Sequence, residues 1–411
     1  MMTPLYRKWA SICLFHFLVV SALGVVLRYK IILPLPAVQQ KYLLYGHSHF
    51  AFTGWVSLAL FTAMLTLFRE RYDAPRTVYR RLFALGFFSA WGMLLTFPFF
   101  GYTWPSLIFT TMAILFSYGL ALQVWRDAGK GLWPAGLNNW FRMALLFYVV
   151  SSLGAFVLGW TMHQKGLGQE WSIGALYFFL HFQYNGWFFF AILGGLEGLM
   201  VRHGAEAGLP HMKRAFVHLA WATVPAFFLS ALWMELPLWV HVLAVISVIG
   251  LGFGLLHLFR AIRAVWPVLG KALVPEVRWL WKLAAIALLI KFLLQILSLF
   301  PGLTTYAFGY RPVVIGFLHL VMLGMVSFFV VGLFLQEDLI NVKSKLARTG
   351  LWTFVSGVIL NEFILMLQGL FSIGGDVLQN GNYYLFAAAC TIFIGLLMLN
   401  VGQRRIRAFT H

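Results

Sequence analysis

Three histidines stand at matching positions in the sequence, each followed five residues later by a glycine. The three segments are His49-Phe-Ala-Phe-Thr-Gly54-Trp55, His181-Phe-Gln-Tyr-Asn-Gly186-Trp187 and His319-Leu-Val-Met-Leu-Gly324-Met325. Imidazole can ligate a metal or haem iron, or hydrogen-bond to its neighbours. A glycine one turn further on admits the close approach of a flat macrocycle or of another helix. The shared pattern H-x-x-x-x-G-[W/M] therefore asks for one common explanation.

The elements that must position these histidines are membrane spans. With 61% hydrophobic and 10% charged residues, the chain has too few polar side chains to cover a soluble globule, so the bilayer must be its solvent. The net charge of +18 does not indicate nucleic acid, because Lys and Arg concentrate between the apolar runs. Twelve apolar runs long enough to span fall near 8–33, 43–68, 80–100, 104–126, 139–162, 171–201, 214–234, 237–260, 278–300, 312–336, 348–370 and 382–401.

The basic residues also orient the spans. Of the 30 Lys and Arg residues, 24 fall in segments on one side of the predicted membrane and five on the other, while Lys291 lies within a span. Because cytoplasmic segments carry the excess of Lys and Arg, we expect both termini on the cytoplasmic side.

The three histidine motifs indicate an internal repeat. Their spacings are 132 and 138 residues, and each copy lies in a span that runs from outside to inside, namely the second, sixth and tenth. We expect a single transmembrane domain over 1–411, made of three four-helix arcs at approximately 8–126, 139–260 and 278–401 that are related by pseudo-threefold symmetry.

Depth in the membrane favours a haem for two of the histidines. His49 and His319 are each expected roughly 10 to 12 Å below the outer boundary, which suits two imidazoles that grip one haem iron from both faces. His181 lies slightly deeper, and could ligate a second centre or only hydrogen-bond in the core. His47, two residues before His49, faces another side of its helix. For each histidine the alternative is an interior residue bonded to neighbouring helices.

Helix number, termini, arcs and histidine positions together resemble the catalytic subunit (subunit I) of the haem-copper oxidase superfamily, most closely its cbb-type branch. The segment Phe317-Leu318-His319 with Gly324 retains the second His of the family's His-x-His and the glycine that follows it. The resemblance implies His49 and His319 as axial ligands of a low-spin haem b. It likewise implies a copper ligand near His181, and location in the bacterial cytoplasmic membrane.

The sequence also departs from that family. Phe317 replaces the His that ligates the high-spin haem, and no His-His pair occurs near Ala231-Leu232-Trp233. Asn185 occupies the position of the family's cross-linked Tyr, with Tyr184 one residue earlier. These departures predict that the oxygen-reducing binuclear centre is absent or rebuilt, and leave open a second haem or copper near His181. His218 and His241 could contribute to a rebuilt site.

Other polar residues fall within or beside the spans. Lys291 and Glu362 could form an ion pair, serve a proton path or find separate structural partners, and nothing in the sequence chooses. Arg311, eight residues before His319, could hold a haem propionate or anchor its helix at the interface.

The function that this pattern favours is a membrane haem b protein in electron transfer or in O2 or NO chemistry, which leaves open whether it is an oxidoreductase. Quinol, cytochrome c and a partner subunit are equal candidates for the electron donor. The alternatives are a non-catalytic haem or metal protein of the nitric oxide response or of oxidase assembly, and a twelve-helix transporter.

Overall fold

A computed structural model describes residues 4–67, 76–130, 135–162, 164, 168–300, 302–304 and 310–408. Every element within those residues is a helix. Ten helices there are long and apolar enough to cross a membrane, and an eleventh span results if Glu206–Thr223 and Pro225–Ala231, bent by 47°, are counted as one. The prediction of an all-α, multi-pass membrane protein is therefore confirmed, while the described residues give ten or eleven such spans where the sequence predicts twelve.

The helix surfaces fit a bilayer. In α10 (Leu238–Ala272), only 33% of the most apolar 18-residue stretch is buried inside the protein. Its exposed side chains include Leu238, Trp239, Ile249, Phe253 and Phe259. Soluble monomers rarely expose an apolar surface of this extent. In a bilayer the same side chains contact lipid tails, so their exposure is favourable.

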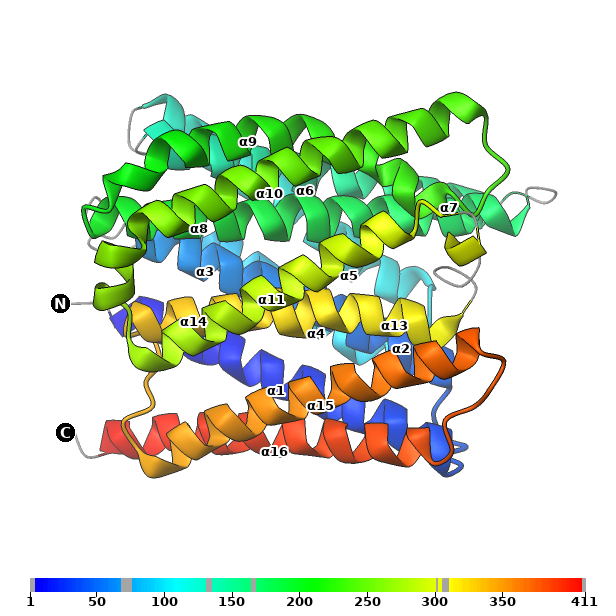
Figure 1. Cartoon of the computed structure of the whole chain (residues 1–411). Helices are drawn as coiled ribbons and strands as arrows, with labels where there is room; N and C mark the ends of the chain where they lie inside the picture. Colours follow the sequence, from blue (N-terminus) through cyan, green and yellow to red (C-terminus); the bar gives the residue numbers. More distant parts are fainter. Residues whose placement is uncertain are drawn as a thin grey trace. The chain divides into compact units, whose positions relative to one another are not determined.

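The chain divides into two compact units, the first made of Met1–Phe116 and Arg311–His411. Its elements are α1 (Pro4–Ile32), α2 (Gln40–His49), η1 (Phe50–Ser57), α3 (Leu58–Leu67), α4 (Thr77–Phe100), the first half of α5 (Trp104–Gly129), α13 (Arg311–His319), η5 (Leu320–Ser327), α14 (Phe328–Gln336), α15 (Lys345–Ile373) and α16 (Gly381–Ala408). The first unit thus combines helices from the two ends of the sequence (Figure 1).

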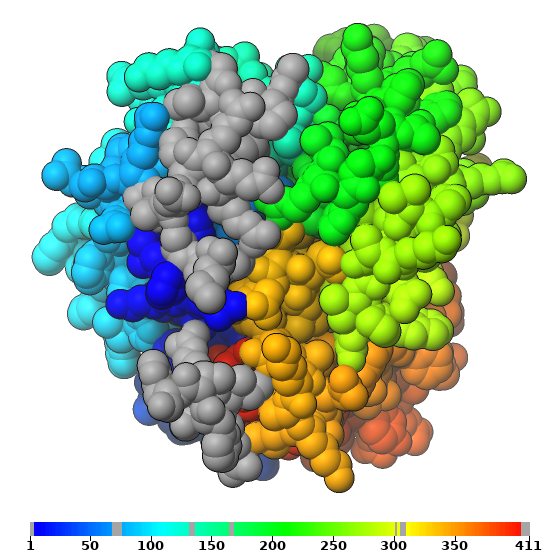
Figure 2. Space-filling model, turned by 90° about the vertical axis from the view of Figure 1, so that its left-hand side faces the viewer, coloured from blue at the N-terminus to red at the C-terminus, as the bar shows by residue number. Residues whose placement is uncertain are grey.

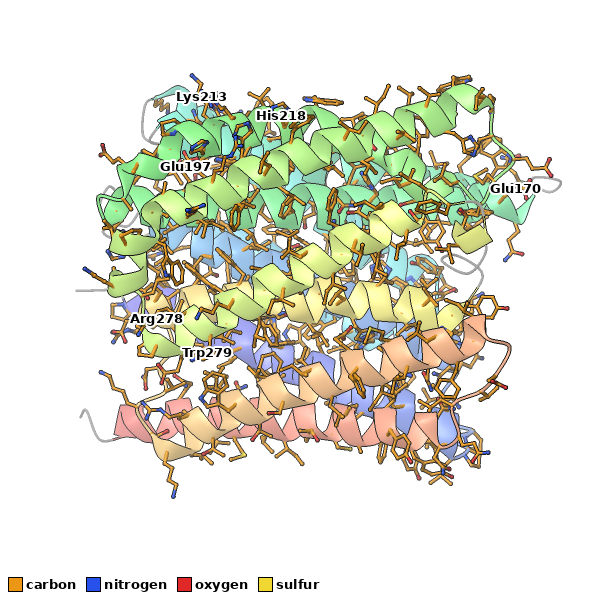
Figure 3. The ribbon with its side chains drawn as sticks, viewed as in Figure 1. Glu170, Glu197, Lys213, His218, Arg278 and Trp279 are labelled. Atoms are coloured by element: carbon orange, nitrogen blue, oxygen red, sulfur yellow. The ribbon has the colours of Figure 1, made fainter. Side chains whose placement is uncertain are left out.

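The second unit is the continuous segment Ser117–Tyr310. Its elements are the second half of α5, α6 (Ala135–Thr161), α7 (Gln169–His181), η2 (Phe182–Phe188), α8 (Phe189–Arg202), η3 (Glu206–Gly208), α9 (Leu209–Thr223), η4 (Pro225–Ala231), α10 and α11 (Pro275–Leu297). The elements α7, η2 and α8 follow one another without a break. Figure 3 shows Glu170 at one end of this continuous helix and Glu197 near the other.

In the first unit, α16 runs back along α1, so that it ends where α1 begins (Figure 1). Midway, the side-chain amide of Asn400 donates a hydrogen bond to the Leu14 carbonyl at 3.3 Å. At the shared end, Arg7 of α1 forms an ion pair with Asp338, just after α14. Figure 2, which looks onto this end, shows the start of α1 in blue against the orange residues that follow α14.

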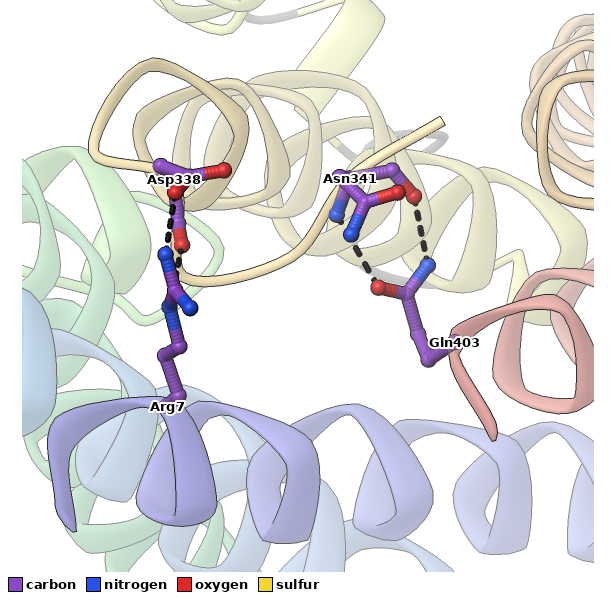
Figure 4. A network of polar contacts seen from close by, with 4 residues as sticks. All are labelled: Arg7, Asp338, Asn341 and Gln403. Carbon is purple, nitrogen blue, oxygen red and sulfur yellow. Dashed lines mark hydrogen bonds and ion pairs between the residues drawn. The ribbon is translucent and has the colours of Figure 1, made fainter. Parts of the chain in front are cut away.

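A second contact closes the same end of the first unit. The side-chain amide of Gln403 donates to the Asn341 carbonyl at 2.6 Å, and its oxygen accepts from the Asn341 backbone N–H at 2.9 Å (Figure 4). The segment between α14 and α15 is therefore held by α1 through one residue and by α16 through another. These contacts keep the start of α1 and the end of α16 together.

The turn between α4 and α5 also belongs to the first unit, and it requires glycine. Gly101 has a positive φ of 57°, and a Cβ there would lie 2.6 Å from the Tyr42 ring. Only glycine adopts this backbone without strain while allowing so close an approach. The turn places Tyr102 beside α2, which matters for the site described next.

Candidate functional site: histidines at pi-helical turns

Each of the three motif histidines is followed at once by a π-helical segment. His49 precedes η1, His181 precedes η2 and His319 precedes η5, and regular α-helix resumes after each segment. π-helical turns are rare and occur frequently at functional sites. The sequence repeat is therefore matched by a repeat of backbone conformation, although the extent of the predicted four-helix repeats stays a prediction.

The tryptophans of the first two motifs rest on equivalent neighbours. Trp55 stacks on Phe17 with the ring centroids 4.3 Å apart and the planes 2° from parallel. Trp187 stacks on Tyr148 at 5.0 Å and 1°. Because Phe17 and Tyr148 occupy corresponding positions in the preceding repeat helices, 131 residues apart, the two copies share packing as well as backbone shape.

The π-helical turn of the first motif is held by a histidine that sequence reasoning missed. His16 of α1 is fully buried, and its Nδ1 lies 2.7 Å from the Gly54 carbonyl oxygen. The Trp91 indole donates to His16 Nε2 at 3.0 Å. Because indole can only donate and a carbonyl can only accept, His16 is neutral with its proton on Nδ1. The only signal in the sequence is a polar residue within the first apolar run.

The first and third motifs meet within the first unit. The Trp55 indole donates a hydrogen bond to Ser327 Oγ at 3.0 Å, and Ser327 is the last residue of η5. Both residues are buried. This contact fixes the helix of His49 against the helix of His319, as a shared ligand site requires.

His49 itself faces the turn between α4 and α5. Its Nε2 shares a hydrogen bond of 2.8 Å with the Tyr102 hydroxyl, and its ring stacks on Phe97 at 4.4 Å and 5°. Burial, together with the nearby Tyr45, raises the pKa of Tyr102 above its ordinary value, so the hydroxyl stays protonated. The expected meeting of His49 with His319 is thus replaced, on the His49 side, by aromatic partners from α4 and the turn.

The histidine of α2 that interacts electrostatically with His319 is His47. Two residues along an α-helix correspond to a rotation of about 200°, so His47 and His49 point to nearly opposite sides of α2. The Nδ1 of His47 is buried and makes no hydrogen bond with the described residues. Its Cε1 lies over Gly24 of α1, 3.7 Å from where a Cβ would be.

His319 is oriented by its own helix. Its Nδ1 donates to the Ile315 carbonyl at 2.8 Å, which leaves Nε2 of the neutral ring as the nitrogen with a free lone pair. Metal-bound histidines are commonly held in this tautomer by a backbone carbonyl. None of the nine residues of α13 is fully buried, whereas eight of the nine in α14 are. The part of the helix that carries His319 is therefore incompletely covered by protein.

Charged groups gather beside the two histidines. Arg28 of α1 interacts unfavourably with Arg311, the first residue of α13, and favourably with Glu362 of α15. It also interacts with both His47 and His319. Glu362 accepts a hydrogen bond from the adjacent Asn361 side chain at 3.0 Å. Two guanidinium groups are therefore held close enough to repel one another.

His181, in the second unit, uses both ring nitrogens. Its Nε2 donates to the Thr223 carbonyl at 2.8 Å, and its Nδ1 accepts from the Asn185 side chain at 3.1 Å. Thr223 ends α9 two residues before Pro225, so carbonyl groups there lack helical donors. The structure thus matches hydrogen bonding in the core, the second of the roles open for His181, and in this arrangement leaves it no nitrogen for copper.

Of the other polar residues in the spans, Lys291, Glu362 and His218 have local partners and His241 Nδ1 has none among the described residues. Lys291 donates to Gln295 at 2.9 Å within α11, just as Glu362 is bonded to its neighbour. His218 of α9 stacks on His257 of α10 at 5.6 Å, near Lys213 in Figure 3. His241 is on α10, with Nδ1 buried and unbonded among the described residues.

Comparison with known proteins adds no assignment. Neither a protein-family model nor a curated protein matches the sequence.

Proposed function

We propose that this chain is a twelve-helix protein of the bacterial cytoplasmic membrane that binds haem b in its first unit, in an arrangement similar to subunit I of the haem-copper oxidases. The observation that carries the proposal is His319 in the ligand tautomer, with the imidazole of His47 in electrostatic range. The cytoplasmic placement of the termini rests on the distribution of Lys and Arg, and the twelfth helix on the unbroken α7, η2 and α8.

The residues present fit a haem held by two histidines. His319 offers Nε2, and His47, whose ring is also hydrogen-bonded to the Val20 backbone, has a buried Nδ1 without a partner among the described residues. A buried polar atom without a partner is costly, and ligation is one way to remove that cost. We therefore favour His47 over His49 as the ligand opposite His319, because the Nε2 of His49 is engaged by Tyr102.

The two arginines fit the haem propionates. Arg28 and Arg311 repel one another, and the attraction of each guanidinium to a propionate carboxylate would offset that repulsion. Glu362 is the single carboxylate that interacts favourably with Arg28, and it is hydrogen-bonded to Asn361. Arg311 thus keeps the role of propionate partner that the sequence suggested, and Arg28 joins it.

A bound haem b of this kind would supply one-electron redox chemistry. The chain's own residues would bind and orient the haem: the Ile315 carbonyl orients the His319 ring, and the two arginines balance the negative charge of the propionates. Because both nitrogens of His181 are occupied and Phe317 replaces a family ligand, we propose electron transfer, with quinol, cytochrome c or a partner subunit as donor, over oxygen reduction.

The proposal is tested by haem analysis of the detergent-purified protein produced with a supply of haem. We expect the pyridine haemochrome spectrum to show haem b in at least stoichiometric amount, and Arg28→Gln to weaken its retention on a gel-filtration column. Lys30→Gln, two residues after Arg28 on α1, is the matched control and should retain haem. Protein that stays colourless after reconstitution with haemin contradicts the proposal.

A further inference from the structure

The second unit contains a small cavity with a buried cation on its wall. Four polar residues line it, Asn185, Thr223, Lys291 and Gln295, and the rest of the wall is made of Leu, Phe and Ala side chains. The space open to the centre of a water-sized particle is about 20 Å³. A cavity of this size holds one or two such particles.

The cation is Lys291, near the middle of α11. It is 6% exposed, and the Gln295 side-chain oxygen is its one hydrogen-bond acceptor among the described residues. An ammonium group has three N–H donors, so two remain without a protein acceptor. No carboxylate is among the described residues that line the cavity. Lys291 therefore has no buried counter-charge.

Two of the other polar residues on the cavity wall, Gln295 and Asn185, add amide N–H donors, whereas the hydroxyl of Thr223 is engaged elsewhere. The amide nitrogen of Gln295 has no acceptor among the described residues, and that of Asn185 uses one N–H for His181. The Thr223 hydroxyl donates to the Leu219 carbonyl at 2.8 Å. His181 interacts electrostatically with Lys291, and both of its nitrogens are already bonded. The cavity thus presents several donors and no negative charge.

We propose that this cavity binds a small monovalent anion of about the size of chloride, with the Lys291 ammonium as its positively charged partner. An uncompensated ammonium in a membrane-embedded core is costly, and either loss of its proton or a bound anion removes that cost. The anion provides the acceptor that the two spare N–H groups lack. Phosphate, carboxylates and other polyatomic anions are too large for the space.

Bromide and chloride serve as probes for the test. The melting temperature of the purified full chain is measured in chloride against gluconate at constant ionic strength. We expect a saturable rise with chloride in the wild-type protein and in Lys282→Met, and no rise in Lys291→Met. Lys282 is the matched control because it lies on the same helix with its ammonium 4.9 Å from the Trp279 ring (labelled in Figure 3), away from the cavity.

The position of a bound halide gives a second readout. Bromide soaked into crystals of the wild-type protein should give one anomalous peak beside Lys291. A wild-type protein indifferent to chloride, a chloride effect that persists in Lys291→Met, or a bromide peak elsewhere overturns the proposal. If Lys291→Met does not fold, the wild-type chloride series and the bromide peak still decide.

Discussion

The Trp55 indole donates a hydrogen bond to Ser327 Oγ at 3.0 Å and so joins the π-helical turn after His49 to the one after His319. Both side chains are buried, and Trp55 is further held by its stack on Phe17. The first and third copies of the sequence motif are therefore in contact in the folded protein. This contact holds η1 against η5, the segments that follow His49 and His319.

This hydrogen bond can be measured by a double-mutant cycle on Trp55→Phe and Ser327→Ala. Each variant should lower the free energy of unfolding in detergent by about 0.5–1.5 kcal/mol, the usual net value of one hydrogen bond. The double variant should lose less than the sum, because both changes remove the same bond. Additive losses would show that the two π-helical turns are not coupled through this contact.

The close packing of the second motif predicts a severe effect of Gly186→Ala. A Cβ at Gly186 would lie 2.4 Å from the Phe147 Cβ, and the backbone of neither helix can shift without disturbing the π-helical turn. We expect destabilisation by about 1–3 kcal/mol or more, as for overpacked cores. Gly159→Ala, where no atom lies within 4 Å of the added carbon, is the control and should be neutral or slightly stabilising. Equal melting temperatures for the two variants would contradict the packing described here.

Replacing His16 should lower the thermal stability of the protein, because His16 hydrogen-bonds to the π-helical turn of the first motif. In His16→Phe, the buried Gly54 carbonyl and the partly buried Trp91 indole both lose their partner. Unsatisfied buried groups cost about 1–3 kcal/mol each, so thermal unfolding should shift to clearly lower temperature. His203→Phe, at the end of α8 and outside the core, is the comparison that should remain close to wild type. A silent His16→Phe would mean that water or the helix itself satisfies the carbonyl.

The helices and the correspondence between them are predictable from the sequence, whereas the side-chain partners of the histidines are not. Hydropathy predicts the spans, and the spacing of His49, His181 and His319 predicts which helices correspond, because both signals are local in the chain. Which of His47 and His49 faces His319 is not predictable from such local signals. It depends on how far α2 is rotated about its axis, which is fixed by contacts such as His49 with Phe97 and Tyr102.

The π-helical turns could not be predicted either. Their residues are mostly types that also occur in the ordinary α-helices of this chain, and the wider turn is contacted from outside, by His16 in the first unit and by Phe147 against Gly186 in the second. The role of His181 was also hidden, because its acceptor at Thr223 is exposed by a helix break 42 residues further along the chain. By contrast, Lys291 and Gln295 lie four residues apart on one helix, so their bond follows from helical spacing.

The contacts in Figure 4 predict unequal effects of two substitutions at one end of the first unit. Arg7 and Asp338 are 48% and 55% exposed, so Arg7→Gln should cost no more than about 1 kcal/mol, and less at high salt. Gln403→Leu removes two hydrogen bonds to the Asn341 backbone and should cost about 1–3 kcal/mol. Chemical unfolding in detergent at two salt concentrations checks both. The reverse order would show that the ion pair, not the amide, holds the segment after α14.

The aromatic partner of His49 separates the two candidate ligand pairs. Tyr102→Phe removes the 2.8 Å hydrogen bond to His49 Nε2 without touching His47. If His47 and His319 hold the haem, the absorbance spectrum of Tyr102→Phe should match that of the wild type, and the protein should be less stable by about 0.5–1.5 kcal/mol. A shifted haem spectrum in this variant would instead place His49 at the iron.

The most direct test of the central claim is the reduced-minus-oxidised visible spectrum of the purified protein compared across His47→Ala, His49→Ala and His319→Ala. We predict the sharp α-band of six-coordinate haem b in the wild type and in His49→Ala, and its loss in both His47→Ala and His319→Ala. Loss in His49→Ala with retention in His47→Ala would contradict the pairing proposed from the structure. An absent band in the wild-type protein would contradict haem binding altogether.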